Sequence, residues 1–412
     1  MKRVVITGIG VVSPIGNDIE TFWNNVKEGN HGIAQITKFD TSDFPIKVAA
    51  EVKDFDPLLC MEKKDVKKRD VYCQYAMEAT RQALEDCGSD FKDVNPYRVG
   101  VLVGTGIGGI QTLEDEYEFF RTKKVRPSFL YAIPKLISNM AAGEIAMKYG
   151  FKGKNFDISS ACATSTNTIG EAFSSIKLGK LDVCIAGGSE AAITPFTLTG
   201  FNSMKTLTTC DDPDRASIPF DKERSGFVMG EGAGIVVLEE LTHALNRNAT
   251  IYAEVVGYGS TADAYHITSP EPQGEAAAQA ILDACQEAGI EPKDVDYFNA
   301  HGTSTPLNDK YETNAIKRAF GDSAKDLFIS STKSMTGHLL GGTGAIEAII
   351  CALSLKNGFI PMTVGYKEYD EECDLNYVTE KGMEKDIAYA MSNSLGFGGH
   401  NAVLCIKKYE EK

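Results

Sequence analysis

The chain has 412 residues, of which 43% are hydrophobic and 24% charged, and its formal net charge is −15 at pH 7. This length allows two or three domains or one large α/β unit, and the composition is ordinary for a globular protein. The acidic balance excludes general nucleic-acid binding, which needs a basic surface to displace counterions from phosphate. An acidic partner must therefore dock on a local basic patch.

The ten cysteines are scattered along the chain, with no CxxC pair and no close Cys/His cluster. This spacing argues against a disulfide framework, and it predicts that the chain has no metal site and works in a reducing, cytoplasmic compartment. No uninterrupted apolar stretch is long enough to cross a bilayer, so no membrane association is expected.

The N-terminal segment Val4–Gly10 is expected to be a strand that runs into a Gly-x-Gly turn, and the same pattern returns near Val255. A longer correspondence links a helix end, a strand and a Gly-Thr turn in the two parts of the chain. In the first part these are Cys87-Gly88, Val99–Val103 and Gly104-Thr105; in the second they are Ala288-Gly289, Tyr297–Ala300 and Gly302-Thr303. Two such matches favour an internal duplication.

The duplication predicts two related α/β halves, at residues 1–250 and 251–412. Strands that alternate with helical segments favour α/β layers with buried parallel strands. Cys162 and His338 each precede a segment that reads as a helix ending at a glycine. The two halves are therefore expected to present a cysteine and a histidine at equivalent turns, which meet at a common centre.

A charged stretch in the first half has basic residues close to helical spacing, and on a helix they form one basic face. Most such runs are only solvated surface. Against an acidic background, however, this patch and a second basic segment at residues 121–126 are the expected docking sites for an acidic partner. The patch consists of Lys63, Lys64, Lys67, Lys68 and Arg69, and Arg126 belongs to the second segment.

Cys162 lies among small residues in Asp-Ile-Ser-Ser-Ala-Cys-Ala-Thr-Ser, between a short apolar run and a segment with apolar residues on one helical face. This pattern predicts a strand, a tight turn and a helix. A thiol at the start of a helix lies next to free N–H groups, so the helix is expected to favour the thiolate and make Cys162 a nucleophile. On this stretch alone, the alternative of a small buried hydrophobic residue stays open.

Three further segments combine residue types that suggest chemistry in addition to a structural role. In His301-Gly-Thr-Ser-Thr-Pro-Leu-Asn-Asp309, a histidine at a strand end is followed by hydroxyls and a carboxylate. In Lys333-Ser-Met-Thr-Gly-His338, a lysine and a histidine precede a helix that carries Glu347. In Asn-Ser-Leu-Gly-Phe397-Gly-Gly-His-Asn, glycines flank one aromatic residue. Isolated histidines are more often structural and glycine clusters usually mark turns, so each segment alone is ambiguous.

Four motifs in this order resemble those of the β-ketoacyl-acyl carrier protein synthases of the thiolase superfamily: Ser-Ala-Cys162-Ala-Thr-Ser, His301-Gly-Thr-Ser-Thr-Pro, Lys333-Ser-Met-Thr-Gly-His338 and Gly-Phe397-Gly-Gly-His-Asn. The resemblance spans nearly the whole chain and is closest to the elongating synthases of type II bacterial fatty acid synthesis. It implies the thiolase-like fold, with two duplicated α/β halves layered α-β-α-β-α, assembled as a homodimer.

The resemblance also implies a mechanism. Cys162 attacks an acyl-carrier-protein thioester and holds the acyl chain, while the backbone N–H groups of Cys162 and Phe397 form the oxyanion hole. Malonyl-carrier protein then loses carbon dioxide, and neutral His301 and His338 hydrogen-bond the thioester oxygen as enolate charge develops. The carbanion attacks acyl-Cys162 and gives the 3-oxoacyl product. No cofactor is expected, since the substrates carry 4'-phosphopantetheine on the acidic acyl carrier protein.

By the same resemblance, other positions support the reaction. Lys333, tied to Glu347, supports the histidines electrostatically rather than transferring protons. Phe397, between glycines, is the gate that admits malonyl only after acylation. The remaining residues are Thr303 and Thr305, which hydrogen-bond the pantetheine arm, Ile107 and Phe201, which line the acyl pocket, and Asp309, which gives structural support.

Three other functions share parts of these motifs. A degradative thiolase uses a second catalytic cysteine late in the chain, whereas this chain has Gly-Phe397-Gly-Gly-His400 at the corresponding turn. A non-catalytic chain-length partner subunit lacks the nucleophile that Cys162 supplies. A ketosynthase of a type II polyketide system shares the motifs strongly, and this alternative stays open.

Overall fold

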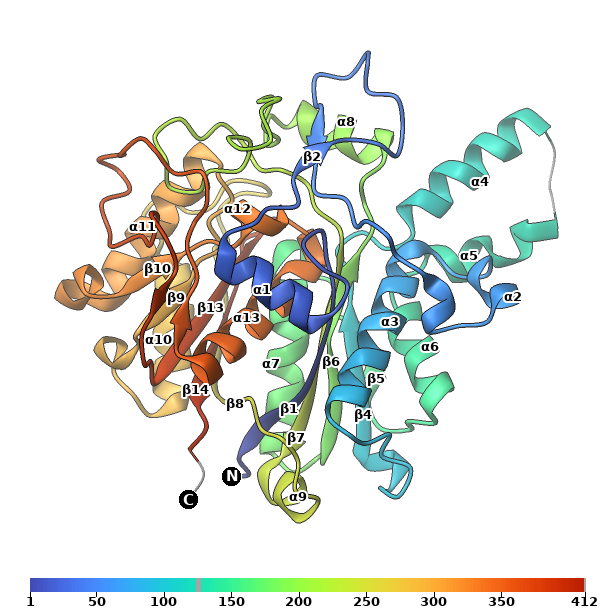
Figure 1. Cartoon of the computed structure of the whole chain (residues 1–412), viewed down its shortest axis with the longest axis horizontal. Helices are drawn as coiled ribbons and strands as arrows, with labels where there is room; N and C mark the ends of the chain where they lie inside the picture. Colours follow the sequence, from blue (N-terminus) through green and yellow to red (C-terminus); the bar gives the residue numbers. More distant parts are fainter. Residues whose placement is uncertain (124–126, 411–412) are drawn as a thin grey trace.

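A continuous ten-stranded sheet runs through the described part of the chain, residues 1–123 and 127–410 of the computed structural model (Figure 1). The strand order is β10-β9-β13-β14-β8-β1-β7-β6-β4-β5. The first half of the chain supplies β1 (Val4–Val12), β4 (Val99–Gly104), β5 (Asn155–Phe156), β6 (Val183–Glu190) and β7 (Gly232–Glu240). The second half supplies β8 (Ala253–Ala262), β9 (Tyr297–Asn299), β10 (Phe328–Ser330), β13 (Tyr389–Gly396) and β14 (His400–Lys408).

The two halves of the sheet repeat one pattern of pairing. In the first half β7 is antiparallel to β1 and β6, and β4 is parallel to β6 and β5. In the second half β14 is antiparallel to β8 and β13, and β9 is parallel to β13 and β10. The first residues of β1 and β8 pair and join the halves, with Val4 opposite Val255. The predicted duplication is confirmed.

The expectation of parallel strands is correct only for the outer strands of each half. β13 and β14 are joined by a short hairpin at Phe397–Gly399, and such a hairpin connects only antiparallel neighbours. β6 and β7 repeat this antiparallel pairing in the first half. The strands that lie nearest the middle of the sheet are therefore antiparallel.

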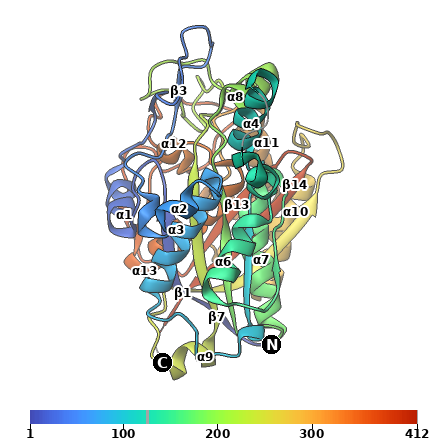
Figure 2. The ribbon, with the colours of Figure 1, turned by 90° about the vertical axis from the view of Figure 1, so that its right-hand side faces the viewer.

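Helices cover the outer faces of the sheet and fill the space between its two halves (Figure 1). In the middle, α7 (Thr164–Lys177) packs on β4, β6 and β7, and α13 (Thr343–Asn357) packs on β7, β13 and β14. On the outer face of the first half lie α3 (Val71–Asp86) and α6 (Met140–Tyr149), which face the reader in Figure 2. On the outer face of the second half lies α10 (Glu275–Ala288), with α11 (Pro306–Phe320) beside it. This order of layers confirms the predicted α-β-α-β-α arrangement.

Shorter elements lie around this core. The helices are α1 (Ile19–Glu28), α2 (Lys63–Val66), α4 (Ile110–Lys123), α5 (Ala132–Leu136), α8 (Pro195–Ser203), α9 (Leu241–Asn246) and α12 (Lys333–Thr336). The strands are β2 (Ala34–Gln35), β3 (Val48–Ala49), β11 (Phe359–Ile360) and β12 (Met383–Glu384). Among the described residues, no helix combines the length and the apolar character needed to pass through a bilayer.

The two central helices approach each other closely at their first turns. A Cβ atom on Gly344, at the start of α13, would lie 2.0 Å from Oγ1 of Thr166 in α7, so glycine permits the contact. One residue further, the N–H of Ala345 donates to Oγ of Ser165 at 2.9 Å. Consequently the turns that precede α7 and α13, at residues 161–163 and 340–342, lie in contact.

The basic run at residues 63–69 does not form one helical face, contrary to the prediction. α2 is a single turn, and Asp70 starts the next helix by accepting the N–H of Tyr72. The last three basic residues therefore lie in the turn between two helices. Arg69 points inward and pairs with Glu144, with an exposed side-chain fraction of only 17%. Arg126, the other predicted docking residue, lies outside the described residues.

Candidate active site

Three side chains from distant segments meet at one point of the fold. Cys162 lies in the turn before α7, His301 follows β9, and His338 follows α12. The cysteine Sγ and one ring nitrogen of each histidine lie within 4.8 Å of one another. All three residues are buried, with exposed fractions of 8%, 3% and 2%. The fold therefore brings together the cysteine and the two histidines that the sequence singled out.

The turn at Cys162 is held by its neighbours. Ala161 has a φ angle of 50°, in the left-handed region that non-glycine residues rarely adopt. The hairpin between β13 and β14 packs against this turn, where a Cβ on Gly396 would lie 2.6 Å from the carbonyl oxygen of Ser160. Only glycine fits there. The close packing directs the backbone N–H of Phe397 at the Cys162 sulfur.

Burial raises the pKa of the Cys162 thiol to about 12. The Lys333 ammonium and the N–H of Phe397 oppose this shift, but the loss of water outweighs them. The net shift is opposite to the one predicted from the helix start, because burial outweighs the nearby N–H groups. The thiol must give its proton to a base when it attacks, and the two imidazoles are the bases within reach.

Both imidazoles are neutral at pH 7, in agreement with the expectation. The pKa values of His301 and His338 lie well below the usual 6.5 because both rings are buried and the Lys333 ammonium is close. The ring centroids lie 5.3 Å apart in an edge-to-face arrangement. Nδ1 of His338 lies 3.0 Å from Oγ1 of Thr343. Neutral rings are suited to accept a proton from a thiol or to donate a hydrogen bond to a developing oxyanion.

Lys333 and Glu347 form a buried ion pair beside the histidines. Nζ of Lys333 lies 2.5 Å from Oε1 of Glu347, and the two side chains are 1% and 2% exposed. Burial raises the pKa of Glu347 to about 7, and Lys333 opposes that shift. The pair therefore places a cation near both rings while a carboxylate balances its charge.

A cavity of about 280 Å³ leads to these side chains. Among its lining residues are Thr303, Thr305, Phe201 and Phe397, all predicted site residues. The hydroxyl oxygens of Thr303 and Thr305 lie 2.9 Å apart. The Phe397 ring rests on Phe201 with a centroid separation of 6.1 Å, and Phe201 packs edge-on against Phe227 at 5.4 Å. In this state Phe397 is packed against the cavity wall.

Ile107 lies apart from the other predicted residues. Its side chain is 37% exposed, and it is not among the described residues that line the cavity. Ile110, in the same segment, is buried in the apolar cluster that contains Cys162 and Phe201. The acyl-pocket role of Ile107 therefore stays a prediction.

Two buried carboxylates that position the site were missed by the sequence analysis. Glu190 accepts the backbone N–H groups of Gly106 at 2.8 Å and Gly341 at 3.0 Å, so it ties the two halves together next to Cys162. Glu312 accepts the N–H of His301 at 2.7 Å. Glu190 ends a fully buried strand, and a carboxylate at the end of an apolar run is the one sequence signal that points to it.

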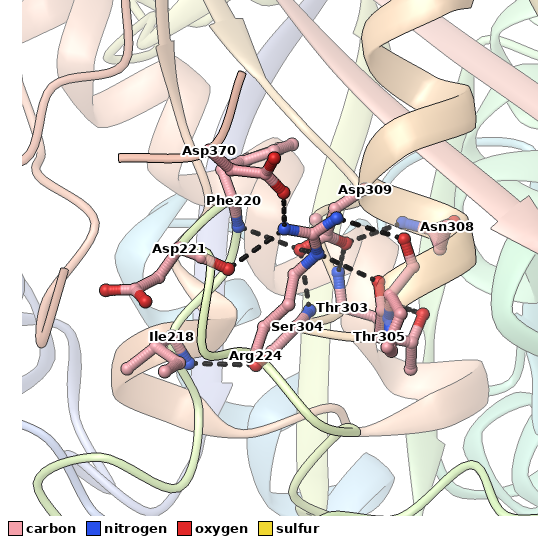
Figure 3. Close-up of polar contacts among 12 residues, drawn as sticks. Ile218, Phe220, Asp221, Arg224, Thr303, Ser304, Thr305, Asn308, Asp309 and Asp370 are labelled. Atoms are coloured by element: carbon pink, nitrogen blue, oxygen red, sulfur yellow. Dashed lines mark hydrogen bonds and ion pairs between the residues drawn. The ribbon is translucent and has the colours of Figure 1, made fainter. Parts of the chain in front are cut away.

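Asp309 holds the threonine loop in place (Figure 3). Its carboxylate accepts the backbone N–H groups of Thr303 at 2.9 Å, Ser304 at 3.1 Å and Phe220 at 2.8 Å. Nε of Arg224 lies 3.7 Å from the same carboxylate. Asp309 thus joins the loop at residues 218–224 to the loop that follows His301, as expected of a supporting residue.

Replacing Asp309 by alanine is expected to lower the free energy of unfolding by about 3–5 kcal/mol, because it leaves the buried N–H groups of Thr303, Ser304 and Phe220 without their acceptor. Urea denaturation measures the loss. The matched control is Glu372→Ala, which removes an exposed carboxylate that pairs with Lys310 and is expected to cost less than about 1 kcal/mol. Equal losses in the two variants would show that Asp309 is no more important than a surface ion pair.

A buried cysteine beside two histidines, on a duplicated five-layer fold, is the arrangement of a thiolase-like acyl-transfer enzyme. Comparison with known proteins narrows this class. The chain belongs to the β-ketoacyl synthase family: residues 1–244 match the beta-ketoacyl synthase N-terminal domain and residues 252–367 match the C-terminal domain.

Relatives of known name match the chain over its length. It is 50% identical over 409 residues to "3-oxoacyl-(acyl-carrier-protein) synthase 2" of Staphylococcus aureus (strain N315), covering 99% of both chains. Its fold is similar to that of the ishigamide ketosynthase/chain length factor, with a TM-score of 0.93, 34% identity and coverage of 99% and 100%. It is also similar to a type II PKS ketosynthase solved with its acyl-carrier protein and the hexaketide, with a TM-score of 0.90, 33% identity and coverage of 99% and 100%.

Proposed function

We propose that this protein catalyses the decarboxylative Claisen condensation of malonyl-acyl carrier protein with a Cys162-bound acyl chain, which gives 3-oxoacyl-acyl carrier protein in type II fatty acid elongation. The observation that carries the proposal is the meeting of Cys162, His301 and His338 at the end of one cavity. The Staphylococcus aureus relative, 50% identical along the chain, has the name of a 3-oxoacyl-carrier-protein synthase.

The first step is transfer of the acyl group. Sγ of Cys162 attacks the thioester carbonyl of the acyl-carrier protein, and its proton passes to a neutral imidazole. The N–H groups of Cys162 and Phe397 stabilise the tetrahedral oxyanion. The packing of the hairpin against the cysteine turn supports this role. The carbon–sulfur bond to pantetheine breaks, and the leaving thiolate takes up a proton.

The second step is decarboxylation and condensation. Malonyl-carrier protein loses carbon dioxide, and the electron pair moves into an enolate whose oxygen accepts hydrogen bonds from His301 and His338. Lys333 stabilises this negative charge at a distance, because it is buried and fixed by Glu347. The enolate carbon attacks the acyl-Cys162 carbonyl, the carbon–sulfur bond breaks, and the cysteine regains a proton.

Two further elements control access. Thr303 and Thr305, on the cavity wall, hydrogen-bond the amides of the pantetheine arm. Phe397 swings on its glycine neighbours and opens the malonyl site after acylation; Gly398 and Gly399 have φ angles of 89° and 76°, which glycine adopts freely. The direct test of the function is a condensation assay with octanoyl- and malonyl-carrier proteins, in which one 3-oxodecanoyl product is expected for each carbon dioxide released.

A ketosynthase of a type II polyketide system is the second candidate function. It is favoured by the similarity to the type II PKS ketosynthase solved with its acyl-carrier protein, at 33% identity. The two functions differ in what happens to an unreduced product. A fatty acid synthase stops after one condensation until the keto group is reduced, whereas a polyketide synthase extends the unreduced chain again, so mass spectrometry of products formed without a reductase separates them.

We propose that the acyl carrier protein docks on the exposed part of the basic run. Lys63, Lys64 and Lys67 are exposed, whereas Arg69 is held by Glu144. An acidic carrier protein is attracted to such a patch on an otherwise acidic surface. The solved relative in complex with its acyl-carrier protein supports a partner of this kind.

Reversing Lys63, Lys64 and Lys67 to glutamate together is expected to raise KM for carrier-protein substrates by about tenfold or more at low salt, with an unchanged rate on short pantetheine thioesters. Steady-state assays on both substrate types measure the split. The matched control reverses three exposed lysines of the second half, Lys293, Lys325 and Lys381. An equal rise in KM in the control would place the docking site elsewhere.

We also propose a homodimer. β5 is one of the two edge strands of the described sheet, with Phe156 41% exposed, and α4 and α5 present Tyr117, Phe120 and Ile133 with exposed fractions of 59%, 56% and 63%. Such a surface is typical of a subunit contact. Phe120→Glu with Ile133→Glu is expected to convert a dimer into a monomer in sedimentation equilibrium. A monomeric wild-type protein would contradict this assembly.

We also propose that the chain divides into two halves, at residues 1–250 and 251–412. The boundary falls between α9, which ends at Asn246, and β8, which starts at Ala253, and each half supplies five strands in the repeated order.

A cytoplasmic location fits the ten cysteines, which are all free and nearly all buried.

A further inference from the structure

The cysteine and the two histidines of the active site form a set of metal-binding donor atoms. Spacing along the chain argued against a metal site, but the fold collects one sulfur and two imidazole nitrogens within 4.8 Å of one another. No other group of this kind is found in residues 1–123 and 127–410. Thiolate and imidazole are the preferred donors of zinc, at roughly 2.3 Å and 2.1 Å from the ion. Donors around one tetrahedral zinc lie roughly 3.5 Å apart, so the side chains must close in on the ion by about 1 Å when it binds.

Each of the two histidines has a buried ring nitrogen without a hydrogen-bond partner. Nε2 of His338 and Nδ1 of His301 are buried and have no hydrogen-bond partner. The other nitrogen of His338, Nδ1, lies 3.0 Å from Oγ1 of Thr343. A contact of this kind fixes the orientation of a metal-binding imidazole and leaves the opposite nitrogen free to coordinate. Thr343 therefore orients the His338 ring, and Nε2 of His338 is left without a partner.

We propose that Cys162, His301 and His338 bind a zinc ion, or another thiophilic divalent cation, in a reversible complex that blocks the nucleophile. On binding, the Sγ–H bond is replaced by an Sγ–Zn bond and the proton passes to the buffer, with no change in oxidation state. The cavity that these residues line would give water access to the ion as a fourth ligand.

Acidic side chains lie close to the positive charge of Lys333 beside the site. Lys333 is the positive group near the histidines, but its ammonium lies 2.5 Å from Glu347 in a buried pair. Glu190 adds a buried carboxylate behind the cysteine turn, through its bond to the N–H of Gly341. Glu347 therefore offsets part of the repulsion that the Lys333 ammonium alone would exert on a bound cation. The proposal concerns binding to the unacylated protein and does not depend on the identity of the acyl substrate.

Titration of the untagged, EDTA-treated and desalted protein with zinc chloride tests the proposal by calorimetry. One zinc per chain is expected, and Cys162→Ala or His338→Ala is expected to weaken binding at least about 100-fold. Thr343→Val is expected to weaken it about tenfold, since it removes only the group that orients His338. The matched control is Cys210→Ser, which removes the one cysteine that is not buried and is expected to bind zinc as the wild type does.

Cobalt(II) chloride gives a readout on the wild-type protein alone, so the test does not depend on the folding of a variant. A sulfur-to-cobalt charge-transfer band in the near ultraviolet and visible bands of tetrahedral cobalt are expected, and prior alkylation of Cys162 with iodoacetamide removes them. Zinc is also expected to protect Cys162 from iodoacetamide until EDTA is added. Absence of the cobalt bands, or zinc binding that survives in Cys162→Ala and His338→Ala, would overturn the proposal.

Discussion

Cys162→Ala is expected to lose condensation activity by at least about 10³-fold and to lose covalent acylation entirely. The reason is that Sγ is the atom proposed to carry the acyl chain between the two steps, and among the described residues no other cysteine clusters with the two histidines. The measurement is product formation from octanoyl- and malonyl-carrier proteins, with the thermal melting temperature recorded alongside. A folded Cys162→Ala variant that still condenses would exclude Cys162 as the nucleophile.

Cys210→Ser is the matched control for this experiment. Cys210 is the one cysteine that is not buried, so it is the residue most open to unspecific acylation. Full activity and unchanged acylation are expected. A loss comparable to that of Cys162→Ala would mean that the covalent intermediate forms away from the cavity.

His301→Ala and His338→Ala are each expected to retain acylation of Cys162 but to lose decarboxylation and condensation by about 10²- to 10⁴-fold. Either imidazole can accept the thiol proton, whereas both are needed to stabilise the enolate oxygen. Release of labelled carbon dioxide from malonyl-carrier protein measures the second step, and intact-mass analysis measures the first. If either variant condensed at the normal rate, the histidine it lacks would not be one that stabilises the enolate.

Glu312→Gln is the control that separates the imidazole itself from the loop that holds it. Glu312 accepts the backbone N–H of His301 and the side-chain amide of Asn393, at 2.7 Å and 2.6 Å. The variant keeps the shape of the side chain and leaves the ring of His301 in place. A smaller loss of decarboxylation than in His301→Ala is therefore expected, and an equal loss would assign the effect to the loop rather than to the ring.

Much of the fold was predictable because the duplication is visible in short sequence segments that repeat in the two halves. The strand at Val4, the strand at Val255 and their glycine turns are short segments whose structure depends on neighbouring residues. The same holds for the helices that start after Cys162 and His338. Their equivalence in the two halves predicted that these residues meet, and the close contact of α7 and α13 confirms it.

Properties that depend on tertiary contacts were not predictable. The helix start at Cys162 predicts a lowered thiol pKa, but burial raises it, and the cysteine turn is packed against Gly396 from a distant part of the chain. Likewise Arg69 was assigned to a basic surface, although its partner Glu144 is far away in sequence. The sequence shows which residues are basic, but it does not show which of them pair with a carboxylate in the fold.

The central claim is that Cys162 carries the acyl chain between two half-reactions. The most direct test is intact-mass analysis of the wild-type protein mixed first with octanoyl-carrier protein and then with malonyl-carrier protein. The expected result is a mass increase of one octanoyl group, located on Cys162 by peptide mapping, which disappears on addition of malonyl-carrier protein as the 3-oxodecanoyl product forms. An adduct on another residue, or product formation with no adduct at any time, would contradict the proposed mechanism.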